Sequence, residues 1–140
     1  MNPAQGLLAV AGLIVLGMGT LHGLLTLRDV GNPRAFTPTD ESVRVAMQNA
    51  RLAFNPRANL WQAWLGFNLS HSLGVALSGG ALLLLAGPCF PAFAASHLVQ
   101  AFAAGLAAVY LVLSLRFWFW GPALGSGLAL LCVLAAIVSA

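Results

Sequence analysis

The sequence predicts an all-α integral membrane protein, an antiparallel four-helix transmembrane bundle with up-down-up-down topology. Of its 140 residues, 60 % are hydrophobic and only 6 % are charged, whereas a soluble domain carries about 25 % charged residues. So few polar side chains cannot cover the exterior of a small soluble particle. The apolar residues also form four stretches that each reach the roughly 20 residues needed to cross a bilayer. A water-soluble monomer is therefore excluded.

The four predicted spans form a single membrane domain over residues 1–140, with boundaries at about 6–27, 60–86, 92–115 and 118–139. The second and third spans are joined by Gly87-Pro88-Cys89-Phe90-Pro91, whose two prolines favour a tight reversal. The third and fourth spans meet near Arg116. Such short connections favour antiparallel neighbours.

The charges predict the orientation of the chain. The chain has six basic residues, all of them arginine, and three acids, and only Arg116 lies outside residues 28–57. In the up-down-up-down topology this segment and Arg116 share one face, which the positive-inside rule assigns to the cytoplasm. Both termini are then outside, and we expect a bacterial inner membrane. The basic pI is explained by this topology, so the sequence does not indicate nucleic-acid binding.

Between the first two spans, the pattern predicts an amphipathic helix at about 38–54. Thr37 offers an N-cap hydroxyl, Pro38 suits the first helical position, and Asn55-Pro56 ends the pattern. We expect this helix to lie at the membrane interface. It would serve either as a surface connector or as a lid, with lipid headgroups contacted by Arg44, Arg51 and Arg57.

Polar side chains within the spans suggest a binding pocket. At a rise of about 1.5 Å per residue, His22, Asn68 and His71 lie roughly 8, 12 and 17 Å from the cytoplasmic end, and Tyr110 lies about 8 Å from it. Because polar groups at this depth tend to face the bundle interior, they are functional candidates. Aromatic walls with a few polar groups suit a lipophilic small molecule or lipid. The predicted ligand-binding residues are His22, Trp61, Trp64, Asn68, His71 and Tyr110.

Two structural interpretations remain open. The polar groups could simply hydrogen-bond between helices. The second span also carries small residues at every fourth position, which favours close packing against the first span. Such ridges equally suit a homo-oligomer or a structural accessory subunit that docks a larger membrane complex. The row consists of Gly66, Ser70, Gly74 and Ser78.

A third interpretation is a metal or haem enzyme using His22 and His71. Such a site needs several ligands at matched depth, and the two histidines differ by more than a helical turn in estimated depth. No cofactor is therefore predicted. No acid lies within a predicted span, so neither a hydrolase triad nor carboxylate-driven proton transport is expected, and catalytic residues are not assigned.

Overall fold

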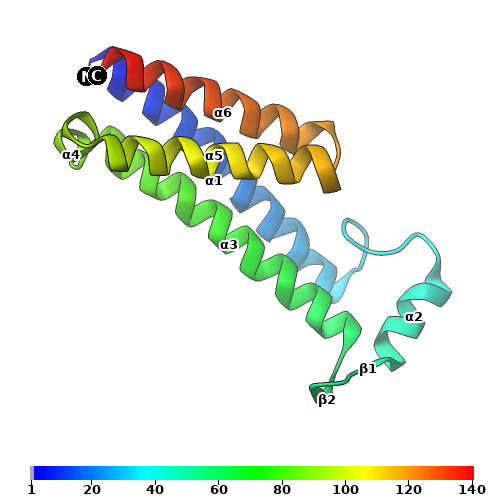
Figure 1. The fold of residues 1–140 in the computed structure, drawn as a ribbon. Coiled ribbons are helices and arrows are strands. Elements are labelled where there is room, and N and C mark those ends of the chain that lie inside the picture. Colours follow the sequence, from blue (N-terminus) through cyan, green and yellow to red (C-terminus); the bar gives the residue numbers. More distant parts are fainter. Residues whose placement is uncertain (1) are drawn as a thin grey trace. The chain divides into compact units, whose positions relative to one another are not determined.

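The computed structural model describes residues 2–140, and the fold is α-helical with one short hairpin. Its elements in chain order, shown in Figure 1, are α1 (Pro3–Gly31), α2 (Glu41–Asn49), β1 (Arg51–Leu52), β2 (Asn55–Asn59), α3 (Leu60–Ala86), α4 (Phe90–Ala95), α5 (His97–Phe117) and α6 (Trp120–Ser139). Four of them, α1, α3, α5 and α6, are long and apolar enough to cross a membrane. The predicted class, an all-α protein with four helices of spanning length, is confirmed, and these helices indicate an integral membrane protein.

Two of the long helices begin with the same hydrogen-bonded cap. Before α1, Asn2 Oδ1 accepts from the Gln5 N–H at 2.8 Å, and Gln5 Oε1 accepts from the Asn2 N–H at 2.9 Å. Before α3, Asn59 and Gln62 make the same reciprocal pair at 2.8 and 3.2 Å. Both are capping boxes of the form Asn-x-x-Gln, and each satisfies helix-end N–H groups that would otherwise lack partners.

The chain packs as two compact units. Unit 1 contains α1 up to Gly19 together with Val75–Ala140, and unit 2 contains Thr20–Gly74. In unit 1, α5 and α6 lie side by side (Figure 1). There α1 approaches α3 so closely that a Cβ built on Gly79 would lie 2.2 Å from the backbone nitrogen of Leu16. Glycine at position 79 is therefore what permits this helix contact.

The segment after α1 differs from the predicted helix at 38–54. The observed helix α2 covers only Glu41–Asn49, and its N-cap is Asp40, whose side chain accepts from the Ser42 N–H. Thr37 is not the cap because its hydroxyl donates to Asp29 instead. After Ala50 the chain turns into a hairpin in which Arg51 pairs with Asn59, so Arg51 lies on a strand rather than on the helix.

The third predicted span, 92–115, is divided in the structure. The short helix α4 ends at Ala95, Ser96 is extended, and α5 starts at His97. The Ser96 side chain accepts from the Val99 N–H at 3.4 Å and so caps α5. Gln100 lies buried one turn into α5 and donates to the Phe93 carbonyl at 3.1 Å, which ties the two helices together.

Candidate functional site

The loop that follows α1 is fixed by one buried carboxylate in unit 2. Asp29 lies in the last turn of α1 and is fully buried. Its Oδ1 accepts from the N–H groups of Arg34 and Ala35 at 2.9 Å, and its Oδ2 accepts from the Phe36 N–H at 2.6 Å and the Thr37 hydroxyl at 3.3 Å. A buried charge needs such donors. Four of them from consecutive residues hold the loop in one conformation.

Phe36 is the loop residue that reaches both long helices of unit 2. Its ring stacks on the His22 ring of α1, with the ring centroids 4.2 Å apart and the planes at 27°. Its carbonyl accepts from the Trp64 indole N–H of α3 at 2.8 Å. The loop is thus connected to α1 by an aromatic contact and to α3 by a hydrogen bond.

Beneath Phe36, α1 and α3 are joined by a polar contact. His22 Nε2 lies 3.1 Å from Asn68 Oδ1, and the Asn68 amide nitrogen donates to the Trp64 carbonyl at 2.8 Å. Because that bond assigns Oδ1 as the acceptor, the proton in the His22 contact resides on Nε2. Asn68 is 1 % exposed, so both of its amide atoms are satisfied inside the unit.

His71 completes the cluster one turn further along α3. Its ring meets the His22 ring edge-on, with centroids 5.4 Å apart and planes at 75°. On the other side it lies parallel to Phe67, with centroids 6.1 Å apart. The two histidines that the estimated depths separated by more than a helical turn are therefore in contact.

A pocket opens beside this cluster. It has a volume of about 440 Å³ and is lined by Ala35, Phe36, Thr37, Pro38, Met47 and Trp64. Its walls come from the fixed loop, from α2 and from α3. They are largely apolar, and Thr37 is the residue with a hydroxyl among them. Trp64 both lines the pocket and connects it to Asn68 through its carbonyl.

Within unit 2 the structure brings together four of the predicted ligand-binding residues. His22, Trp64, Asn68 and His71 form the cluster, and Trp61 lies buried one turn before Trp64 on α3. Tyr110 lies on α5 in unit 1. The residues that sequence reasoning missed are those of the loop and α2, above all Phe36, Pro38 and Met47. The available signal was an aromatic residue and a proline, Phe36 and Pro38, shortly before the α2 N-cap Asp40.

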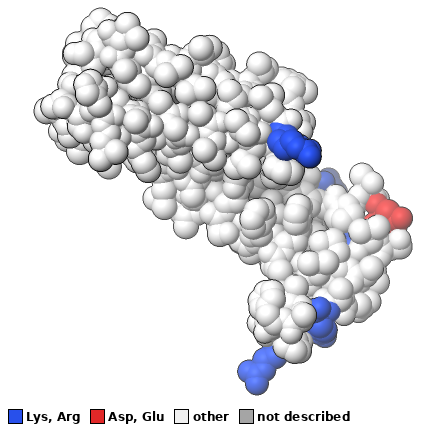
Figure 2. All heavy atoms as spheres, in the orientation of Figure 1, with Lys and Arg blue, Asp and Glu red and all other residues white. Residues whose placement is uncertain are grey.

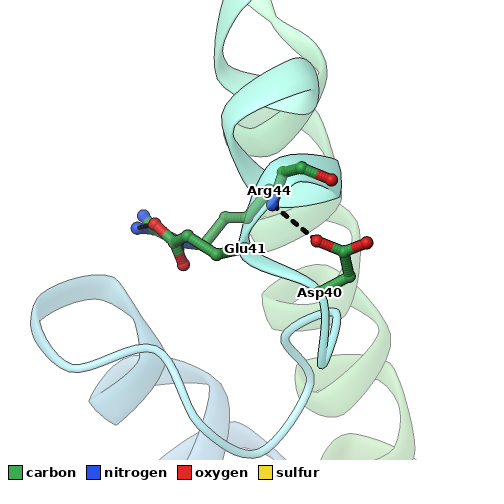
Figure 3. A network of polar contacts seen from close by, with 4 residues as sticks. Asp40, Glu41 and Arg44 are labelled. Carbon is green, nitrogen blue, oxygen red and sulfur yellow. Dashed lines mark hydrogen bonds and ion pairs between the residues drawn. The ribbon is translucent and has the colours of Figure 1, made fainter.

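The arginines predicted to contact lipid headgroups lie on α2 and the hairpin. Arg44 is paired with Glu41 one turn away, and this hydrogen-bonded pairing lowers the pKa of the Glu41 carboxyl (Figure 3). Arg51 on β1 and Arg57 on β2 are exposed. Figure 2 shows charged side chains gathered over α2 and the hairpin of unit 2.

The small-residue row of α3 is not where α1 packs in unit 2. A Cβ built on Gly66 would meet no atom within 4 Å, and Ser70 is exposed. The close approach instead involves Gly23 of α1, where a Cβ would lie 3.3 Å from Ser72 Cβ. Ser72 is buried and its hydroxyl donates to the Asn68 carbonyl. Ser72 therefore lies on the contact face of α3, and the predicted row lies on another face.

Within residues 2–140, His, Cys, Asp and Glu form no group of three with the placement of a metal site. Scans of protein-family models, curated proteins and solved structures each find no match to this chain. A functional assignment therefore depends on the chemistry of the pocket and of the His22, Asn68 and His71 cluster beside it.

Proposed function

We propose that unit 2 binds a lipophilic small molecule or a lipid in the pocket lined by the loop, α2 and α3. The observation that carries this proposal is the pocket itself, whose apolar walls include Phe36, Met47 and Trp64. It is an open hollow of about 440 Å³, and small-molecule sites combine such apolar walls with a few fixed polar groups.

The anchoring of the loop supports binding without a large conformational cost. The Asp29 carboxylate fixes the backbone at Arg34, Ala35 and Phe36 through three N–H bonds. A wall that is already ordered loses little conformational entropy when a ligand arrives. The polar end of the ligand would meet Thr37 at the pocket wall, with His22 behind the Phe36 ring.

We further propose that the four long helices cross a bacterial inner membrane in up-down-up-down order, with the pocket facing the cytoplasm. The support is the distribution of arginine. Arg28 and Arg34 flank the end of α1, and Arg116 lies in the last turn of α5. Arg44 lies on α2, and Arg51 and Arg57 lie on the hairpin between α2 and α3. In this topology all six share the cytoplasmic face. The helix α2 would then lie in the cytoplasmic interface.

The pocket is tested by native mass spectrometry of protein extracted in a mild detergent. Met47→Trp places a large ring in the pocket, whereas Val45→Trp adds the same ring to an exposed position of the same helix. We expect a small-molecule or lipid adduct on the wild type and on Val45→Trp, and its loss from Met47→Trp. Equal adduct on all three proteins, or none on the wild type, would refute the proposal.

A second candidate function is an accessory subunit of a larger membrane complex. The observation that favours it is the open row at Gly66 and Ser70 of α3, because small residues on a lipid-facing surface allow another helix to approach closely. A Ser70→Leu variant should release such a partner while leaving the pocket adduct unchanged. A wild-type protein that purifies from cross-linked membranes without a partner would exclude this function.

A further inference from the structure

The hairpin of unit 2 presents an exposed aromatic side chain at its turn. Its strands β1 and β2 run antiparallel, with Leu52 opposite Asn55, and the turn consists of Ala53 and Phe54. Phe54 exposes 86 % of its surface. Asn55 Oδ1 accepts from the Arg57 N–H at 3.2 Å, which stabilises the bend after the turn. The hairpin therefore holds a large apolar group away from its own unit.

The chain connectivity places this hairpin directly before a helix that is apolar enough to cross a membrane. Its second strand runs into α3 without a linker, since β2 ends at Asn59 and α3 begins at Leu60. The Leu60 N–H also donates to the Ala50 carbonyl at 3.0 Å, which joins the base of the hairpin to the start of the helix. At about 3.3 Å per strand residue, the turn lies within roughly 20 Å of a helix that is apolar enough to cross a bilayer.

The charges around the turn match an anionic surface. Arg51 and Arg57, one on each strand, are both exposed. Among the described residues the one ion pair joins Arg44 and Glu41, so no carboxylate neutralises either hairpin arginine. Phenylalanine is among the side chains that interfacial segments bury at the headgroup level, and arginines near the membrane surface are attracted to anionic lipids.

The strand edge argues against a protein partner that would add a strand. Pro56 lies in β2 and has no N–H to donate, and a proline at this position is a common means of blocking edge-to-edge pairing. The first strand has only two residues. The exposed side chain at the turn, and not the backbone of the strands, is therefore the part of the hairpin available to a partner.

We propose that the hairpin is a membrane-surface anchor: Phe54 inserts into the headgroup region of the bilayer that α3 crosses, and Arg51 and Arg57 bind phosphates of anionic phospholipids. This proposal rests on α3 crossing the membrane, and it does not require the pocket to hold a ligand. The anchor would fix the end of unit 2 against the lipid surface and so restrain the segment between α1 and α3.

The test uses the full chain with a fluorescent label at the turn. In a Cys89→Ser, Cys132→Ala background, Phe54→Cys is labelled with the polarity-sensitive dye NBD and reconstituted into nanodiscs of phosphatidylcholine and phosphatidylglycerol. The control label is placed at Thr39, an exposed loop residue outside the hairpin. We expect a blue-shifted emission and strong quenching by doxyl-labelled lipids at position 54, with neither effect at position 39.

Two comparisons make the result decisive. In nanodiscs of phosphatidylcholine alone, or with Arg51→Gln and Arg57→Gln combined, the quenching at position 54 should fall by several-fold. Emission at position 54 that equals that at Thr39 would overturn the anchor, and so would a blue shift without lipid quenching, which would indicate coverage by protein. Equal quenching in both lipid mixtures would overturn the role of the arginines. Loss of the pocket adduct affects none of these outcomes.

Discussion

Replacing Asp29 with alanine should release the loop that forms the pocket wall. The carboxylate is fully buried and accepts from the N–H groups of Arg34, Ala35 and Phe36. Alanine removes the carboxylate that accepts from all three donors. The perturbation is local because the helix α1 tolerates alanine better than aspartate at this position.

The expected magnitude follows from the hydrogen bonds. A bond to a charged acceptor contributes about 1.5–3 kcal/mol when the donor is buried, and less where water replaces it. Arg34 and Ala35 are exposed, so water compensates part of the loss. At roughly 1 kcal/mol for each of the three bonds, the loop loses about 3 kcal/mol of local stability, which corresponds to about a hundredfold change in its opening equilibrium.

Hydrogen exchange, measured by mass spectrometry on the purified protein, reports the opening equilibrium of the loop. The peptide containing residues 34–36 should exchange about a hundredfold faster in Asp29→Ala than in the wild type. Thr37→Val removes only the 3.3 Å hydroxyl bond to the same carboxylate and is the matched control, with an expected change within about fivefold. Unchanged exchange in Asp29→Ala would refute the role assigned to this carboxylate.

Two further predictions concern helix packing and pH. Gly79→Ala should destabilise unit 1 by about 1–3 kcal/mol, because the new Cβ would lie 2.2 Å from the backbone nitrogen of Leu16. Gly66→Ala should be neutral or slightly stabilising, because a Cβ there meets no atom within 4 Å. Denaturant unfolding in micelles measures both variants. The Glu41 carboxyl should titrate below its ordinary pKa by NMR and return toward it in Arg44→Gln. Because this pKa is lowered by folding, the pairing stabilises α2 at neutral pH and is lost as pH falls toward the lowered value; a Glu41 midpoint unaffected by Arg44→Gln would contradict it.

The four long helices were predictable because the signal that defines them is local. A run of about 20 apolar residues is costly to expose to water wherever it lies in the fold. Asn2 and Gln5 repeat the spacing of Asn59 and Gln62, a local signal that the predicted boundary near residue 6 did not use, since α1 begins at Pro3. The break at Ser96 was harder to predict, because residues 92–95 and 98–99 on its two sides are apolar and continue the pattern of a single span.

The end of α2 is set by contacts with the start of α3, which the local pattern of apolar residues does not show. Residues 50–54 continue the helical spacing of apolar residues, yet Arg51 pairs with Asn59 and the Leu60 N–H bonds to Ala50. These interactions tie α2 to the start of α3. The helix start was misplaced for a similar reason, because Thr37 is a good capping residue whose hydroxyl is used by Asp29.

Part of the candidate site was predictable from depth alone. His22 and Asn68 have similar estimated depths, and the structure places them 3.1 Å apart. The pocket was not predictable, because its walls at Phe36 and Met47 depend on how the loop folds back. That fold is set by side-chain acceptors for backbone N–H groups, and such pairings are not visible in a pattern of hydrophobicity.

The chain has only three acidic residues, and all three order the segment between α1 and α3. Asp29 fixes the loop, Asp40 caps α2, and Glu41 pairs with Arg44 within that helix. A mere connector between two spans would need no such order, since flexible loops close at small entropic cost. Ordering this segment costs conformational entropy that hydrogen bonds must offset. The proposed pocket would explain why this segment is ordered, because a pocket whose wall is already ordered binds its ligand more tightly than one whose wall must first become ordered.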